Sequence, residues 1–222
     1  MDSITHVLSA ALWTEPVGTP RWAPGNERGE IAAAYARWRE RMAVGLGALL
    51  PDADGLLGWP GLFGFSADAT LYAKYHRTVT HSILGFAVVI VVSAAISRVW
   101  PERWLLPFLR TKHGGRLIVK PSWRRLIAFS AVAVFWHFIG DSVTAWGTLR
   151  ILWPFSDFDA QLRRVNSLEP VLLALTVAAW GAQHFCLTRG LTKSAWAIAA
   201  AWLLLCAVYV WLRPHFGAPA FV

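Results

Sequence analysis

The chain has 222 residues, of which 56% are hydrophobic and only 15% are charged, with a formal net charge of +8. Soluble domains usually carry about 25% charged residues, so this composition excludes an ordinary soluble globule and indicates a membrane protein. Fourteen tryptophans agree with this interpretation, because indole rings favour the headgroup layer. The basic residues lie mainly in loops between apolar segments, which favours membrane lipids, anionic ones in particular, over nucleic acid as the partner.

The N-terminal region predicts shorter helices that pack on or into one face of the molecule. Residues 3–13 form an apolar stretch, interrupted by His6, that is shorter than the roughly 20 residues a bilayer span needs. Residues 14–30 are rich in proline, glycine and charge and predict a loop. Residues 31–50 predict a helix with an amphipathic first half and an apolar second half, which Pro51 ends.

Four apolar segments in the rest of the chain predict membrane spans. They are separated by a basic loop over residues 101–125, by a loop over 147–170 and by a short basic turn that holds Arg189 and Lys193. The positive-inside rule places the basic loop in the cytoplasm, and the short turn falls on the same side if all four segments cross. The four segments are residues 83–100, 126–146, 171–187 and 195–212.

These elements predict an all-α, polytopic membrane protein with about four transmembrane helices plus shorter N-terminal helices. We expect a single membrane-embedded domain over residues 1–222. Its residues 1–157 carry the motifs described below, and residues 158–222 hold the two C-terminal spans. No cleavable signal peptide is expected, because the acidic Asp2 stands where such a peptide has a basic segment.

The second predicted span contains two ionisable residues, His137 and Asp141. Because they are four positions apart, they share one face of a helix and can converge on one ion. Ionisable residues inside a membrane are costly and are functional candidates for that reason. Thr144 falls on the neighbouring turn of the same face. A His–Asp hydrogen bond inside a helix bundle would explain the pair equally well.

A second cluster, from His76 to Ser82, comes directly before the first predicted span. If this segment is helical, His76 and Thr80 share a face, and His81 lies about 100° round from Thr80. Arg77 lies inside the cluster and is suited to hold a phosphate oxygen, although a salt bridge to a nearby aspartate is an equal alternative. Polar residues at a membrane interface would give the same pattern without a metal.

Two further clusters lie closer to the N-terminus. Asp52 and Asp54 follow the predicted helix stop, and in an extended turn they would point to opposite sides. One of them could then ligate an ion while the other orients a histidine or binds a second ion. His6 lies in the first apolar helix, which Asp2 is expected to cap. Taken alone, an ordinary turn and a core histidine would account for these residues.

Together the four clusters indicate a divalent-metal site with one or two ions. Histidine nitrogens combined with aspartate oxygens suit zinc, manganese or iron rather than calcium, and zinc is our first choice. The two cysteines form no CxxC motif, which excludes a thiolate zinc site. His113, His184 and His215 are placed differently and are expected to be structural. The seven candidate ligands, more than one tetrahedral zinc needs, are His6, Asp52, Asp54, His76, His81, His137 and Asp141.

The order and spacing of these motifs resemble the YdjM-type family of inner-membrane, predicted metal-dependent hydrolases. The resemblance covers roughly residues 1–157 and implies a location in the inner membrane. The His/Asp pattern is also distantly similar to helical zinc phospholipases C and P1-type nucleases, although it lacks their N-terminal tryptophan ligand and their full set of later histidines. The matching motifs are Met1-Asp2-Ser3-Ile4-Thr5-His6, Leu50-Pro51-Asp52-Ala53-Asp54, His76-Arg77-Thr78-Val79-Thr80-His81-Ser82, His137-Phe138-Ile139-Gly140-Asp141-Ser142-Val143-Thr144-Ala145-Trp146-Gly147 and Trp153-Pro154-Phe155.

Three hypotheses for the function follow. The first is a membrane-bound metal-dependent hydrolase of a phospholipid or another membrane-associated phosphoester. In it Asp54 is a ligand or the general base, Arg77 holds phosphate, and Thr80 and Thr144 support the ligands. The second is a divalent-cation transporter, against which the last two predicted spans argue because they look empty of polar groups. The third is a structural or regulatory membrane protein in which a metal only staples helices together.

Overall fold

The computed structural model describes residues 3–17, 27–53, 78–100, 121–144, 148–165 and 169–213. Within these residues the regular structure is helical, apart from one isolated bridge between Thr144 and Val165, so the predicted all-α class is confirmed. A 3-10 turn, η1 (Glu15–Val17), follows the first helix. The six α-helices are α1 (Ser3–Thr14), α2 (Glu27–Leu49), α4 (Ile83–Val99), α6 (Trp123–Val143), α7 (Pro170–Thr188) and α8 (Thr192–Leu212).

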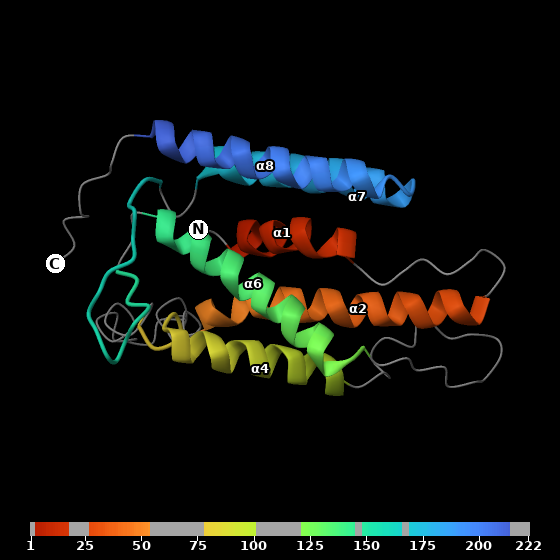
Figure 1. Cartoon of the computed structure of the whole chain (residues 1–222), viewed down its shortest axis with the longest axis horizontal. Helices are drawn as coiled ribbons and strands as arrows, with labels where there is room; N and C mark the ends of the chain where they lie inside the picture. The colour runs from red at the N-terminus through yellow and green to blue at the C-terminus, as the bar shows by residue number, and fades with distance from the viewer. Residues whose placement is uncertain are drawn as a thin grey trace, which may run out of the picture.

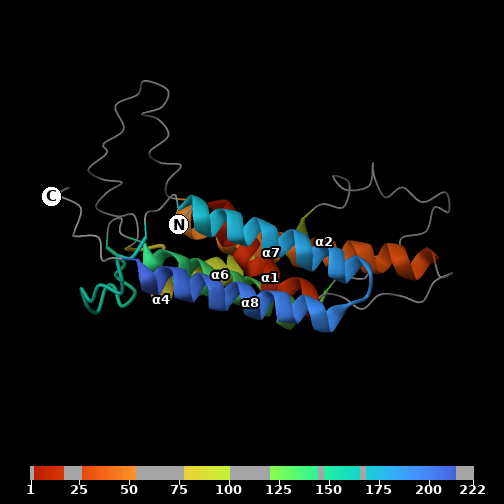
Figure 2. The same cartoon turned by 90° about the horizontal axis from the view of Figure 1, so that it is seen from above.

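The helices run side by side along one long axis (Figures 1 and 2). α7 and α8 pair along one side, α1 lies between that pair and the other helices, and α2, α6 and α4 form the opposite side. α6 contacts α1, α2 and α4, and α1 also contacts α2 and α7. α1 is therefore central to the bundle, although it has only 12 residues.

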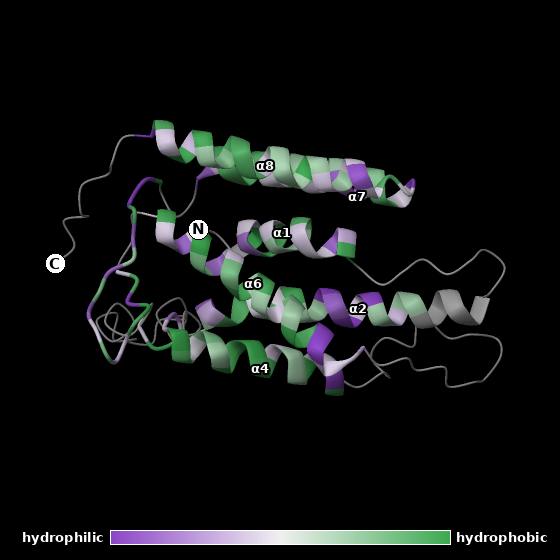
Figure 3. Ribbon diagram, viewed as in Figure 1, coloured by the Kyte–Doolittle hydropathy of each residue, from purple (hydrophilic) through white to green (hydrophobic). Residues whose placement is uncertain are grey.

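Three helices, α6, α7 and α8, are long and apolar enough to cross a membrane. α4 is also apolar but has only 17 residues, which at 1.5 Å per residue is about 26 Å, less than the roughly 30 Å of a hydrocarbon core. Half of the apolar stretch of α6 is buried, against 17% for α7 and for α8. The surface that α7 and α8 expose is thus largely apolar (Figure 3), as lipid contact requires.

Small residues let α2 and α6 approach each other closely. A Cβ atom on Gly47 of α2 would lie 2.8 Å from the carbonyl oxygen of Ser130 and 3.0 Å from the Cβ of Ala133, both in α6. Such small-residue contacts are typical of helices that pack inside membranes. The buried cluster between α1, α2, α4 and α6 is likewise rich in alanine, with Ala10, Ala43, Ala48, Ala94 and Ala133.

Two helices begin earlier than the sequence predicts. Ser122 accepts a hydrogen bond at its Oγ from the N–H of Arg125 and so caps α6, because serine supplies the acceptor that a helix start lacks. α6 therefore begins inside the predicted basic loop. α2 begins at Glu27, so the predicted loop over residues 14–30 is shorter than expected. The amphipathic first half of α2 simply continues toward the N-terminus.

The segment after α6 folds back onto the end of that helix. The N–H of Leu162 donates to the carbonyl oxygen of Ser142, and those of Arg164 and Val165 donate to that of Val143. These bonds satisfy carbonyl groups that a helix end leaves without partners. α6 therefore ends at Val143, before the expected end at residue 146.

α7 and α8 form a hairpin joined by the predicted short turn. Gly190 has a φ of 77°, its N–H donates to the carbonyl oxygen of Leu187, and the N–H of Leu191 donates to that of Cys186. This pair of bonds is the Schellman motif, in which glycine takes the left-handed position at lowest cost. The hairpin places the end of α8 beside the start of α7, at the end of the bundle where α6 also ends (Figure 1).

The last two helices are not empty of polar groups, which corrects one expectation. Gln183 of α7 is 1% exposed and donates to the carbonyl oxygens of Leu12 and Ala195. Nε1 of Trp202 in α8 donates to Oγ1 of Thr176 in α7. These hydrogen bonds tie α7 to α1 and α8, so the polar groups serve helix packing.

Candidate metal centre

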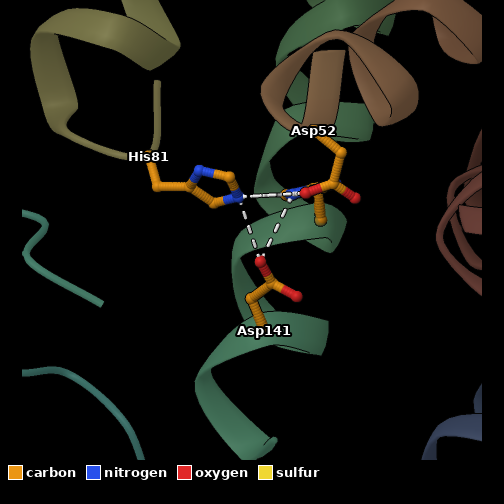
Figure 4. Close-up of side chains that lie close together, drawn as sticks. Asp52, His81 and Asp141 are labelled. Carbon is orange, nitrogen blue, oxygen red and sulfur yellow. Dashed lines mark hydrogen bonds and ion pairs between the residues drawn. The ribbon is translucent and has the colours of Figure 1, made fainter. Parts of the chain in front are cut away.

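Four ligand-type side chains meet at the end of the bundle where α2 and α6 end and α4 begins. His137 and Asp141 lie in the C-terminal half of α6. Asp52 follows α2 in a 3-10 turn, and not in the extended turn that the sequence suggests, while His81 stands in the turn directly before α4. Figure 4 shows the imidazole of His81 and the carboxylates of Asp52 and Asp141 pointing toward one another. One ligand atom from each of the four residues lies within 4.8 Å of the others.

The atoms that meet are Nε2 of both histidines and one oxygen of each aspartate. Nε2 of His81 lies 3.0 Å from Nε2 of His137 and 3.1 Å from Oδ2 of Asp141. Oδ1 of Asp52 lies 3.4 Å from Nε2 of His81 and 3.6 Å from Nε2 of His137. Oδ2 of Asp141 lies 3.5 Å from Nε2 of His137. The side chains of His81, His137 and Asp141 are at most 1% exposed, whereas that of Asp52 is 24% exposed.

Hydrogen bonds behind the two rings determine which nitrogen faces the group. Nδ1 of His137 lies 2.8 Å from the carbonyl oxygen of Ala48. Because a carbonyl oxygen only accepts, Nδ1 carries a hydrogen, and a neutral His137 then presents the lone pair of Nε2. Nδ1 of His81 lies 3.0 Å from Oγ1 of Thr80, a hydroxyl that can accept in the same way. Metal-ligating histidines usually have a partner of this kind.

The turn that carries His81 is not helical in its described part, residues 78–82. Oγ of Ser82 donates to the carbonyl oxygen of Val79 and accepts from the N–H of Gly85, which caps α4. A Cβ atom on Gly85 would collide with that same carbonyl oxygen. The helical face proposed for this cluster is therefore replaced by a tight turn packed on the start of α4, and this turn directs His81 toward α6.

The two carboxylates beside the two ring nitrogens favour a positive charge among the four converging atoms. Two neutral imidazoles that direct lone pairs at each other across 3.0 Å, beside two carboxylates, would repel one another. A hydrogen on Nε2 of one ring or a cation between the four atoms removes that repulsion, and the two carboxylates are best balanced by a cation. Around a tetrahedral zinc ion with ligands at about 2.0–2.1 Å, neighbouring ligand atoms are about 3.3 Å apart. Five of the six separations among these atoms lie between 3.0 and 3.6 Å and therefore fit a small divalent ion such as zinc.

The charges of the group also attract a proton. Burial lowers the pKa of His81, but hydrogen bonds to Asp141 and Asp52 raise it more, so the net pKa lies above its ordinary value. Burial raises the pKa of Asp52, but the hydrogen bond from His81 and the charge of His137 lower it more, to about 2. Asp52 is thus ionised at neutral pH, and because the pKa of His81 is raised, a metal ion competes with a proton for this ring.

His6 lies beside this group and contacts it through Asp141. Its ring stacks on that of His137 with the centroids 4.1 Å apart. Nε2 of His6 lies 3.3 Å from Oδ1 of Asp141, the oxygen that does not face His81. Burial and the charge of His137 lower the pKa of His6 to about 4, so this ring is neutral at neutral pH. Asp141 therefore contacts imidazole nitrogens with both of its oxygens.

The other predicted site residues are placed as follows. Asp54, His76 and Arg77 lie outside the described residues, so their roles stay predictions. Oγ1 of Thr144 donates to the main-chain carbonyl oxygen of Asp141 and helps to end α6. His184 is exposed and stacks on a tryptophan of α7, whereas His113 and His215 lie outside the described residues.

Comparison with known families identifies the chain. The family model described as YdjM inner membrane protein matches residues 1–216, so the chain belongs to this family and is an inner-membrane protein. The match confirms the resemblance seen in the motifs and extends it through α7 and α8. Neither a curated protein nor a solved structure matches the chain.

Proposed function

We propose that this inner-membrane protein is a metal-dependent hydrolase of a phospholipid or another membrane-associated phosphoester. The observation that carries the proposal is a buried group of ligands with one side open. His81, His137 and Asp141 are shielded, whereas Asp52 is 24% exposed. Structural zinc sites are closed, and catalytic ones keep a position for water or substrate. Because four protein ligands would fill a tetrahedral zinc ion, water or substrate would enter as a fifth ligand on the side next to Asp52, an expansion that catalytic zinc sites undergo.

The chain's own residues would position the reaction. A divalent ion held here would lower the pKa of a water molecule and polarise a phosphoryl oxygen. The carbonyl oxygen of Ala48 and the hydroxyl of Thr80 keep Nε2 of each histidine aimed at the group. The ionised Asp52 attracts the cation at the open side. Asp54 as ligand or general base, and Arg77 as the phosphate-binding residue, complete the proposed machinery.

The position of the group in the bundle supports a membrane-associated substrate. The group lies at the end where the candidate spans α6 and α8 end and α7 begins (Figure 1). Phosphoesters of lipid headgroups lie at this level of a bilayer. The neighbouring segment exposes Phe155 at 83% and Phe158 at 59%, which suits the headgroup layer, where aromatic rings gather.

The transporter alternative receives less support from the described residues. An ion path would use polar groups along the spans. The buried polar side chains of α7, Thr176 and Gln183, are instead engaged with main-chain oxygens and with Trp202. They hold helices together, and the ligand-type residues gather at one end of the bundle.

The direct test is turnover in reconstituted membranes. Wild-type protein in liposomes of mixed phospholipids, supplied with zinc or manganese, should release headgroup or phosphate products that mass spectrometry detects. His137→Ala and Asp52→Ala should reduce turnover to background, and the exposed His184→Ala serves as the matched control.

Turnover retained in both ligand variants would overturn the proposal. Metal flux into the liposomes without product would favour the transporter, and a melting temperature that falls on chelation without any turnover would favour the structural role.

A further inference from the structure

We infer that a second site, a pocket between α1, α6, α7 and α8, holds an acyl chain of an anionic lipid whose phosphate binds Arg164. The pocket has a volume of about 370 Å³, within the range of small-molecule sites in proteins. Its walls include Trp136, Leu172, Trp202 and Val210, which offer an apolar surface to a hydrocarbon chain.

The pocket lies next to the candidate metal centre, and α1 and α6 contribute residues to both. Thr5 of α1 and Gly140 of α6 line it, and each is the immediate neighbour of a residue of the centre, His6 and Asp141 respectively. A lipid in the pocket would therefore lie at the same depth in the bundle as the metal centre. Arg164 follows α6 and is bonded to the end of that helix, so the charge stands at the end of the pocket near the bundle end.

Arg164 has an uncompensated charge among the described residues. Its neighbour Arg163 pairs with Asp159, and Arg213 pairs with Glu169. The guanidinium of Arg164 donates to the carbonyl oxygen of Arg213 and stacks over Trp211, with no carboxylate within 4.0 Å in the described part of the chain. Such a cation, held in place but not neutralised, suits the oxygens of a phosphate.

One cation at the mouth of an apolar pocket matches an amphiphile with one anionic head and a hydrocarbon tail. α8 supplies more of the pocket wall than any other helix, and its apolar stretch, like that of the neighbouring α7, is only 17% buried. Lipid is the medium that surrounds these two helices, and the lining residues Leu203 and Trp211 are exposed to it. That this lipid is the substrate rests on the proposed function, whereas its binding does not.

The experiment measures lipid retention. Protein is purified in mild detergent and exchanged into phosphatidylcholine nanodiscs that contain a minor share of phosphatidylglycerol. Native mass spectrometry then counts the lipids that stay bound after the protein is released from the nanodiscs. Arg164→Gln removes the cation. Arg189→Gln is its control, because Arg189 also stacks on an aromatic ring, Phe185, and pairs with no described carboxylate. Ala207→Phe fills the pocket, and Ala201→Phe adds the same bulk to an exposed position of α8 outside it.

We expect wild type and both controls to retain phosphatidylglycerol in preference to phosphatidylcholine. Arg164→Gln should lose that preference by about tenfold, as the loss of one charge-assisted contact predicts, and Ala207→Phe should lose bound lipid of both kinds. Equal retention by wild type and both pocket variants would overturn the inference. The inference would also be overturned if the wild type is a dimer and Ala207→Phe makes it a monomer, because a second copy of the chain would then cover the pocket.

Two further measurements keep the test independent of folding and of the metal centre. Cys206 lines the pocket and Cys186 does not, so added phosphatidylglycerol should slow maleimide labelling of Cys206 alone. Unchanged labelling would count against the inference. His137→Ala should still retain the lipid, because it removes a metal ligand and no part of the pocket. Lipid binding without metal or turnover would refute only the proposed function.

Discussion

At the scale of single residues, three contacts fix the imidazole of His137. Its Nδ1 donates to the carbonyl oxygen of Ala48, its face stacks on His6, and its Nε2 faces the other ligand atoms. Nδ1 of His81 has a comparable support in the hydroxyl of Thr80. Contacts of this kind set the direction of a ligand and its basicity, and their loss typically weakens metal binding about 10- to 100-fold.

Thr80→Val should therefore weaken metal binding by about 10- to 100-fold without removing a ligand. The change keeps the shape of the side chain and takes away the oxygen beside Nδ1 of His81. Competition with a fluorescent zinc chelator measures the affinity. Thr188→Val, at the far end of α7, is the control. Equal affinity of the two variants would show that this hydroxyl does not support the site.

Metal affinity should also depend on pH. Because the pKa of His81 lies above its ordinary value of 6.5 and metal binding displaces that proton, affinity should fall as the pH is lowered through the raised pKa. In the metal-free protein the sign is opposite: the proton on His81 adds stability below pH 6.5, and this stability is lost as the pH rises through the pKa of the folded state. Melting temperatures with and without chelator from pH 6 to 9 should therefore diverge, and parallel curves would contradict this account.

Some of the site residues can be predicted from sequence and others cannot. The spacing of His137 and Asp141, four positions apart, predicts that they share one face of a helix. The role of Ala48 could not be foreseen, because it acts through a main-chain oxygen that any residue carries. The distance between Asp52 and His81 depends on how two turns pack against α6, which a local pattern does not encode.

At the scale of the element, the contact between α2 and α6 positions the site. Gly47 lies against Ser130 and Ala133, and the next residue, Ala48, supplies the oxygen that holds His137. Gly45, on the same helix, has nothing within 4 Å of the place where a Cβ atom would stand. The two glycines therefore provide a matched pair for testing whether close helix approach matters.

Gly47→Ala should destabilise the protein by about 1–3 kcal/mol, because the added carbon forces α2 away from α6. It should also weaken metal binding by moving both Asp52 and the oxygen of Ala48. Gly45→Ala should leave metal binding unchanged and add about 0.5–1 kcal/mol of stability, since alanine is the better helix former. Thermal unfolding in detergent and zinc titration measure both effects, and similar behaviour of the two variants would refute the role of the α2–α6 contact.

The helices themselves were largely predictable, and their ends less so. Hydropathy locates α4, α6, α7 and α8, because an apolar stretch of this length in a membrane protein indicates a helix in contact with the bilayer. The start of α6 depends on the cap at Ser122, and its end depends on Leu162 and Arg164, which come from a segment folded back in space. Such a tertiary contact leaves no periodic signal in the sequence.

At the scale of the whole molecule, five described basic residues lie at the end of the bundle opposite to the candidate metal centre, whereas Arg150, Arg163, Arg164 and Arg213 lie at the same end as the centre. The end of α4, the start of α6 and the α7–α8 turn gather at one end, and the metal centre lies at the other (Figure 1). From the positive-inside rule we predict that the first of these ends lies in the cytoplasm and the candidate metal centre on the opposite side of the inner membrane. The described basic residues at that end are Arg98, Arg124, Arg125, Arg189 and Lys193.

Labelling of single cysteines in cells tests this orientation. In a chain without Cys186 and Cys206, a membrane-impermeant maleimide should label Ser156→Cys, in the segment that follows α6, in intact cells with a permeable outer membrane. It should label Thr192→Cys, in the α7–α8 turn, only after the inner membrane is opened. The reverse pattern would place the metal centre in the cytoplasm.

The central claim, that Asp52, His81, His137 and Asp141 bind a divalent metal, is tested most directly by elemental analysis of protein purified in detergent without chelators. The account predicts about one to two zinc, manganese or iron ions per chain in wild type. It predicts the same content in His184→Ala and a loss of metal in His137→Ala and Asp52→Ala. Wild-type protein without bound metal, or variants that keep a full complement, would contradict the claim and leave the four side chains as a hydrogen-bonded group that shares a proton.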